Sequence, residues 1–225
     1  MLARLVRVRT VVGNGRPVVS FTFDNFPSEV AARQAEVLES FGGAGTFYTA
    51  LDAPASEGQA RDIEALDRLL RRGHDIGLLG LGPNESGEVI DRRKAELSGR
   101  LKDCFVSSYA YFGEAISLRQ KHAAENRFTA ARSRLEGMNA GEIDLGLLRS
   151  VHLGYGGDQV DDRVKRWLTE GAAKRGWLIL NQSSSDAVGP LKATIEIAAS
   201  LGFEILTVRN ALGAIGWPAN STNAT

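Results

Sequence analysis

Short apolar runs alternate along this chain with longer segments in which apolar residues recur at helical spacing. The runs at 18–23, 46–49 and 177–180 are rich in β-branched, aromatic and small residues, which is typical of strands buried on both faces. In 28–41 and 59–72 the apolar residues recur three and four positions apart, which predicts amphipathic helices. The first run, which ends at Asp24, is the predicted first core strand.

The same criteria predict the remaining elements and, from their order, the fold. Further strands are expected at 5–12 (an edge strand), from His74, and at 105–112, 147–153 and 203–208, and further helices at 88–101, 117–133, 160–175 and 190–201. A repeated order of strand, helix, glycine and strand requires parallel strands joined by helical crossovers. Six or more such units favour a closed or nearly closed barrel, whose site lies at the carboxyl ends of the strands.

Composition narrows the class of protein further. A chain of 225 residues with 43% hydrophobic residues predicts one domain over 1–225, with a possible edge strand in 1–16 and a tail at 217–225. Its 27 basic and 27 acidic side chains balance, so nucleic acid is not an expected partner. A single cysteine, no secretory leader and no apolar stretch of membrane-spanning length predict a cytoplasmic protein without a membrane span.

Asp24 is the first candidate for chemistry, because α/β folds place their reactive side chains at the tips of buried parallel strands. Aspartate is also a preferred N-cap of the following helix. Position alone favours neither interpretation.

Several segment ends resemble the polysaccharide deacetylase family, the metal-dependent carbohydrate esterases that remove acetyl groups from glycans. The resemblance runs from Val18 to about Leu212, and its matching pieces are 20–27 (SFTFDNFP), 45–48 (GTFY), 73–77 (GHDIG), 109–113 (YAYFG), 176–179 (GWLI) and 211–212 (AL). It implies an α/β fold, a distorted (β/α)7 barrel of the TIM-like type. It also implies a divalent metal such as zinc, with Asp24 at the position of the general base.

The residues at the implied metal positions depart from the family pattern. Asn25 stands where the family has a ligating aspartate, and Leu79 and Pro83 stand where it has two histidines. The segment 181–185, Asn-Gln-Ser-Ser-Ser, stands where the family has a histidine–aspartate pair. The remaining histidines His122 and His152 are isolated and are weak evidence for a metal site. We therefore expect no metal and no other cofactor.

Deacetylation needs a water activated by a metal, a base and an acid. Without the metal, Asp24 is at most a remnant base. The neutral polar residues expected at the mouth of the barrel, where the strands have their carboxyl ends, suit the binding of a ligand. Sugars stack on aromatic rings and bond to amides and hydroxyls, so the expected binding residues are Asn25, Tyr109, Tyr111, Asn181, Gln182 and Ser183.

Three functions follow as hypotheses. The leading one is a catalytically degenerate relative in carbohydrate metabolism that binds a glycan or a partner protein, the partner being an active deacetylase relative or a second copy. The alternative is an enzyme, either a weak deacetylase with Asp24 as base or another hydrolase using Asp24 with Asn25. The third is a purely structural subunit without saccharide binding.

Overall fold

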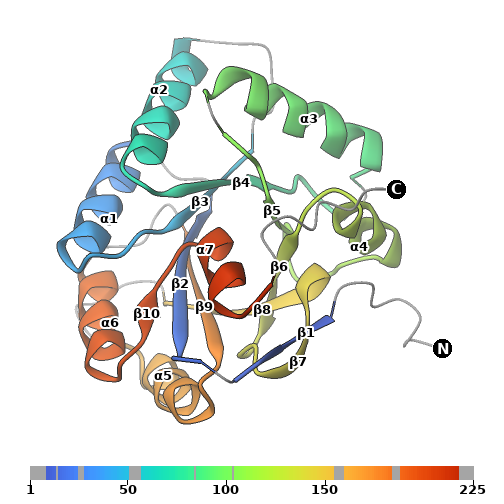
Figure 1. Cartoon of the computed structure of the whole chain (residues 1–225). Helices are drawn as coiled ribbons and strands as arrows, with labels where there is room; N and C mark the ends of the chain where they lie inside the picture. The colour runs from blue at the N-terminus through green and yellow to red at the C-terminus, as the bar shows by residue number, and fades with distance from the viewer. Residues whose placement is uncertain are drawn as a thin grey trace.

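The computed structural model is a barrel of parallel strands wrapped by helices (Figure 1). It describes residues 9–13, 15–24, 28–50, 57–83, 85–102, 104–154, 160–183 and 188–217. Asn25 therefore lies outside the described residues, and so do the segments 51–56 and 155–159.

Seven parallel strands of the described residues form the barrel, in the order β2-β3-β4-β5-β6-β8-β9, and β9 pairs with β2 to close it. This confirms the predicted (β/α)7 barrel. The strands are β2 (Val18–Asp24), β3 (Thr46–Thr49), β4 (Asp75–Leu79), β5 (Ser108–Ala110), β6 (Ala130–Glu136), β8 (Leu148–His152) and β9 (Trp177–Ser183).

The helices cover the outside of the barrel, because each parallel pair of strands needs a crossover. They are α1 (Ser28–Ser40), α2 (Glu57–Arg71), α3 (Gly87–Arg100), α4 (Leu118–Glu125), α5 (Asp162–Lys174) and α6 (Val188–Ser200). Their buried residues join the outward side chains of the strands in one apolar cluster, which includes Phe21, Leu38 and Leu180. None of the helices in the described ranges has the length and apolarity needed to cross a bilayer.

Strand β2 shows how the two faces differ. Val19, Phe21 and Phe23 join the cluster under the helices, whereas Ser20 accepts a hydrogen bond from the indole N–H of Trp177 at 3.0 Å. Side chains of a strand alternate between its faces, so Asp24 lies on the same face as Ser20, toward the barrel axis. The carboxylate therefore points into the mouth, at the carboxyl end of the barrel.

The opposite end, the base of the barrel, is covered by α7 (Val208–Ala214), which Figure 1 shows across the strands. The Val208 N–H donates to Thr46 Oγ1 at 2.9 Å. The short strand β10 (Glu204–Ile205) pairs with the start of β2, and β1 (Arg9–Val12) pairs antiparallel with β7 (Gly141–Asp144). Val12, Ile143 and Leu212 belong to the apolar cluster at this end.

Two sequence predictions are wrong in this region. The helix expected over 117–133 ends at Glu125, and residues 130–136 form strand β6. Arginines in that strand gave it a charged pattern that resembles a solvated helix. The strand expected over 203–208 covers only residues 204–205 and is followed by α7, which the sequence did not predict.

His74 lies at the base of the barrel and has a structural role. Its Nδ1 accepts from the Gly45 N–H at 3.0 Å, and its Nε2 lies 2.9 Å from Glu39 Oε1. Burial lowers the pKa of His74, which together with the acceptor role of Nδ1 favours the neutral ring with its proton on Nε2. A ring engaged on both nitrogens at the end opposite the mouth is not available as a ligand there.

Asp75 gives a prediction for stability against pH. Burial raises the pKa of its carboxyl to about 6 although Arg209 opposes the change. The folded protein then holds more protons than the unfolded chain at pH values between the two pKa values, so the contribution of Asp75 is greatest at low pH and is lost as the pH rises through about 6. The free energy of unfolding, measured by urea denaturation, should therefore gain up to about 3 kcal/mol relative to Asp75→Asn as the pH falls from about 7 to about 4. A difference that is constant or that shrinks would contradict this.

Candidate functional site

The mouth of the barrel is built from the inward side chains at the carboxyl ends of its strands. β2 contributes Asp24, and the register places Asp24 beside Tyr48 of β3 and Ser183 of β9. Across the barrel, β6 contributes Arg132 and Arg134, which lie two positions apart and hence on the same face. The mouth therefore brings one carboxylate and two guanidinium groups together.

Asp24 is held by both arginines. Arg132 Nη2 donates to Asp24 Oδ1 at 2.5 Å, and Arg134 Nη2 lies 3.4 Å from Asp24 Oδ2. The Arg132 side chain is 0% exposed and that of Asp24 is 3% exposed, whereas the Arg134 side chain is 39% exposed. The Arg132 guanidinium also lies over the Tyr48 ring, 5.1 Å from its centroid. Both oxygens of Asp24 thus lie against a guanidinium group.

The residues described at the mouth do not fit the divalent metal that the resemblance implies. Guanidinium groups stand against Asp24 where a cation would have to bind, and like charges repel. Leu79 is buried with Tyr48 and Ala110, and Pro83 is exposed in a turn. Within the described ranges, no group of three or more His, Cys, Asp or Glu side chains is arranged to hold a metal ion.

Tyr109 and Tyr111 do not line the mouth, contrary to the sequence prediction. Both are 0% exposed and belong to the apolar cluster under the helices. The Tyr109 hydroxyl donates to Glu85 Oε2 at 2.8 Å, and the Tyr111 hydroxyl donates to the Gly146 carbonyl at 2.8 Å. In β5 the alternate residues Ser108 and Ala110 face inward, so the two tyrosines point outward. Their rings therefore offer no face on which a sugar in the mouth could stack.

The segment 181–183 is divided between the two faces of β9. Asn181 faces inward, where its Oδ1 accepts from Ser150 Oγ at 3.4 Å. Gln182 is buried on the alternate, outward face. Ser183 continues the strand beside Asp24, but its side chain lies outside the described part of the structure, as do Ser184 and Ser185. Asn25, the remaining predicted binding residue, lies outside it as well.

A cavity of about 360 Å³ opens beside Asn181, between the ends of β6, β8 and β9. Eight of its nine lining residues carry polar or charged side chains, and the lining comprises Glu114, Arg134, Glu136, Ser150, His152, Gly154, Asp161, Arg163 and Asn181. Arg163 is fixed there by Glu136 Oε2 at 2.8 Å and by the His152 carbonyl at 2.9 Å. Such a wall offers donors and acceptors for hydroxyl and amide groups.

His152 faces this cavity although the sequence gave little reason to select it. Its Nδ1 accepts from the Gly154 N–H at 3.0 Å, which in a neutral ring leaves the proton on Nε2. The bond sets the tautomer of the ring and turns the backbone after β8.

Arg132 and Arg134 are the main residues that sequence reasoning missed. The signal was present as a two-residue alternation, with Ala130, Arg132 and Arg134 sharing one strand face. It was hidden because the whole segment was assigned to a helix, where these residues would not share a face.

A buried polar network occupies the loop between β4 and α3, where the sequence resemblance implied two histidine positions. Glu85 accepts hydrogen bonds from the Leu81 N–H, the Tyr109 hydroxyl and Arg93. Arg93 Nη2 also donates to the Leu79 carbonyl at 2.8 Å. The loop is therefore shaped by an internal ion pair.

Comparisons with solved structures identify what the fold is similar to. The Xyl-CE4 domain of a multidomain xylanase from the hindgut metagenome of Trinervitermes trinervoides aligns at 16% identity with a TM-score of 0.58, over 91% of this chain and 94% of that one. The chitin deacetylase from Colletotrichum lindemuthianum aligns at 12% identity with a TM-score of 0.58, over 90% of each chain. BA3943 from Bacillus anthracis, a CE4 family pseudoenzyme, aligns at 11% identity with a TM-score of 0.60, over 91% of this chain and 67% of that one.

No protein-family model and no curated protein matches the sequence. At identities this low the structural matches show the fold. The chain has the fold of the CE4 carbohydrate esterases and polysaccharide deacetylases, and the resemblance stated from the sequence is confirmed at that level.

Proposed function

We propose that this chain, with its carbohydrate-esterase fold, is a non-catalytic relative of the polysaccharide deacetylases that binds a glycan at the mouth of its barrel. One observation carries the proposal: the carboxylate at the position of the family's base is paired with two arginines. A general base must reach the proton it removes, and a metal-bound water needs negative or neutral ligands around the ion. At this mouth both oxygens of the carboxylate lie against guanidinium groups, which supports a role for Asp24 other than that of a base.

The cavity beside Asn181 supports the binding part of the proposal. Its donors and acceptors include the exposed part of Arg134, the hydroxyl of Ser150 and the amide of Asn181. Saccharides are recognised by such groups because nearly every ring carbon carries a hydroxyl that can donate and accept. BA3943 is a pseudoenzyme on this fold, and a mutant of it has restored enzymatic activity, so the fold itself can persist without the activity.

The test combines metal analysis, an acetate-release assay and a glycan array on the purified chain. We expect no stoichiometric zinc, nickel or cobalt, no acetate release from acetylated glycans, and saturable binding of at least one glycan. Replacing Arg134 by alanine should weaken that binding roughly tenfold, because a hydrogen bond from a charged donor is lost. Arg33→Ala, on the exposed face of α1, is the matched control and should bind normally.

Two outcomes would overturn the proposal. A stoichiometric metal lost in Asn25→Ala, together with acetate release, would establish the deacetylase alternative. Absence of binding to every glycan on the array would favour a structural subunit.

A further inference from the structure

A second cleft lies at the base of the barrel, away from the mouth. Its volume is about 480 Å³, and it is lined by Asp67, Leu70, Arg71, Gly73, His74, Lys102 and Arg209. The basic residues come from three separate segments: Arg71 ends α2, Lys102 follows α3, and Arg209 is the second residue of α7. The fold thus gathers three cationic side chains around one opening.

Arg209 is held rigidly at this cleft. Its Nη2 lies 2.9 Å from Asp75 Oδ1 and donates to the Phe105 carbonyl, and its Nε lies 3.4 Å from Ser107 Oγ. Its Nη1 donates to none of the described residues, and the side chain is 39% exposed. A guanidinium fixed in advance loses little conformational entropy when it binds an oxyanion.

The charges around the cleft do not cancel. Arg71 is paired with Asp67, and Arg209 is paired with the buried Asp75. Lys102 is exposed and forms no ion pair with any residue that the structure describes, so the described groups leave one net positive charge. Basic residues often follow helix carboxyl ends because of the helix dipole, which accounts for Arg71. It does not account for Arg209, which lies in the first turn of α7.

An aromatic surface adjoins these cations. Phe105 is 54% exposed, and the Arg209 guanidinium lies 5.7 Å from the centroid of its ring. The site therefore combines hydrogen-bond donors for an oxyanion with an exposed aromatic ring beside them.

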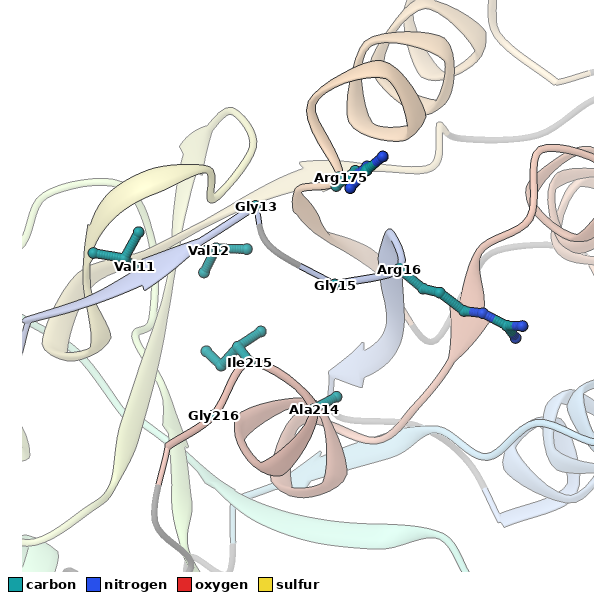
Figure 2. Close-up of a pocket in the computed structure, with 9 residues that line it drawn as sticks. All are labelled: Val11, Val12, Gly13, Gly15, Arg16, Arg175, Ala214, Ile215 and Gly216. Atoms are coloured by element: carbon teal, nitrogen blue, oxygen red, sulfur yellow. The ribbon is translucent and has the colours of Figure 1, made fainter.

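Another cavity at the base lacks this arrangement. It measures about 360 Å³, and Figure 2 shows the side chains of Val12 and Ile215 facing its interior while Arg16 extends away from it. Its lining combines aliphatic side chains with Arg16 and Arg175, and nothing in the structure indicates what would occupy it.

We propose that the cleft of Arg71, Lys102 and Arg209 binds a tetrahedral oxyanion, the phosphate or sulfate group of a small ligand. Arg209 supplies the fixed donor, and Arg71 and Lys102 close on the anion from the two helix ends. The site is separate from the proposed glycan site and can be tested independently of it.

The experiment follows the arginine side-chain N–H resonances of the ¹⁵N-labelled chain by NMR. Inorganic phosphate, inorganic sulfate and a hexose phosphate are titrated in turn, with chloride at equal ionic strength as the reference. We expect a saturable shift of the Arg209 Nε resonance with the oxyanions and none with chloride. Tighter binding of the hexose phosphate would show that the ligand carries an organic group against Phe105, and equal binding would show that the free oxyanion suffices.

Variants assign the effect to the cleft. Lys102→Ala and Arg71→Ala, both at exposed side chains, should each weaken oxyanion binding roughly ten- to a hundredfold. Arg209→Lys keeps a charge beside Asp75 and should weaken binding through loss of the planar fork. Lys192→Ala, at an exposed position of α6, should leave binding unchanged. Equal shifts with chloride, or unchanged affinity in both Lys102→Ala and Arg71→Ala, would overturn the proposal.

Discussion

Replacing Arg132 by alanine is expected to lower the free energy of unfolding by about 3–5 kcal/mol, the cost of removing one partner from a buried ion pair. The Asp24 side chain is 3% exposed and has its shortest contact, 2.5 Å, with Arg132. Of its partners among the described residues, the carboxylate in the variant keeps Arg134, at 3.4 Å. Urea denaturation followed by circular dichroism measures the loss.

A double variant distinguishes the effect of breaking the ion pair from the effect of losing side-chain packing. Asp24→Asn with Arg132→Met removes both charges while keeping the volumes similar, and replacement of a whole buried pair is often close to neutral. We therefore expect the double variant to be more stable than Arg132→Ala alone. Arg132 Nε and Nη1 are buried without a hydrogen-bond partner in the described structure, which adds to the cost of keeping this arginine charged in the barrel. A loss below about 1 kcal/mol in Arg132→Ala would mean that Asp24 is not held as described.

The second large effect is expected at Glu85. Its side chain and that of Arg93 are each 3% exposed, and Glu85 also accepts from the Tyr109 hydroxyl. Glu85→Ala removes the carboxylate that both Arg93 and Tyr109 contact, so we expect a loss of about 3–5 kcal/mol in unfolding free energy. Hydrogen exchange should also rise at the Leu81 N–H, which donates to Glu85.

Two further variants control this experiment. Glu85→Gln retains acceptor and donor atoms and should lose less stability than Glu85→Ala. Glu88→Ala, at an exposed position in the first turn of α3, should cost less than about 1 kcal/mol, the scale of a helix-dipole interaction. If Glu85→Ala and Glu88→Ala were equally mild, the network would not shape the loop.

The sequence alone identified some of the residues in these predictions and not others. Asp24 was readable because a buried apolar run ends on it, and strands of parallel sheets carry their chemistry at that end. Its arginine partners could not be predicted from the sequence, since Arg132 lies 108 positions further along the chain. Nothing local specifies which strand will face Asp24 until the barrel closes.

The direction of individual side chains was also beyond the sequence. Strand β5 is buried on both faces, so its residues show no alternation between apolar and polar positions that would identify the inward face. The tyrosines of 109–111 were therefore expected at the mouth, although they pack outward. Asn181 and Gln182 were expected together for the same reason, and β9 directs them to opposite faces.

The sequence by itself indicated the barrel class and most of its strands, because apolar runs, helical spacing and terminal glycines are local patterns that strands, helices and turns each require. It did not show β6, which its charged residues assigned to a helix. Through the resemblance it also predicted that residues unable to hold a divalent metal stand at the positions of the family's metal ligands. The tertiary structure alone decided that two arginines pair with Asp24, that Glu85 shapes the loop after β4, and that three cations meet at the base. Ion pairs and clefts join residues distant in the chain, and their geometry exists only after the strands have taken their order around the barrel.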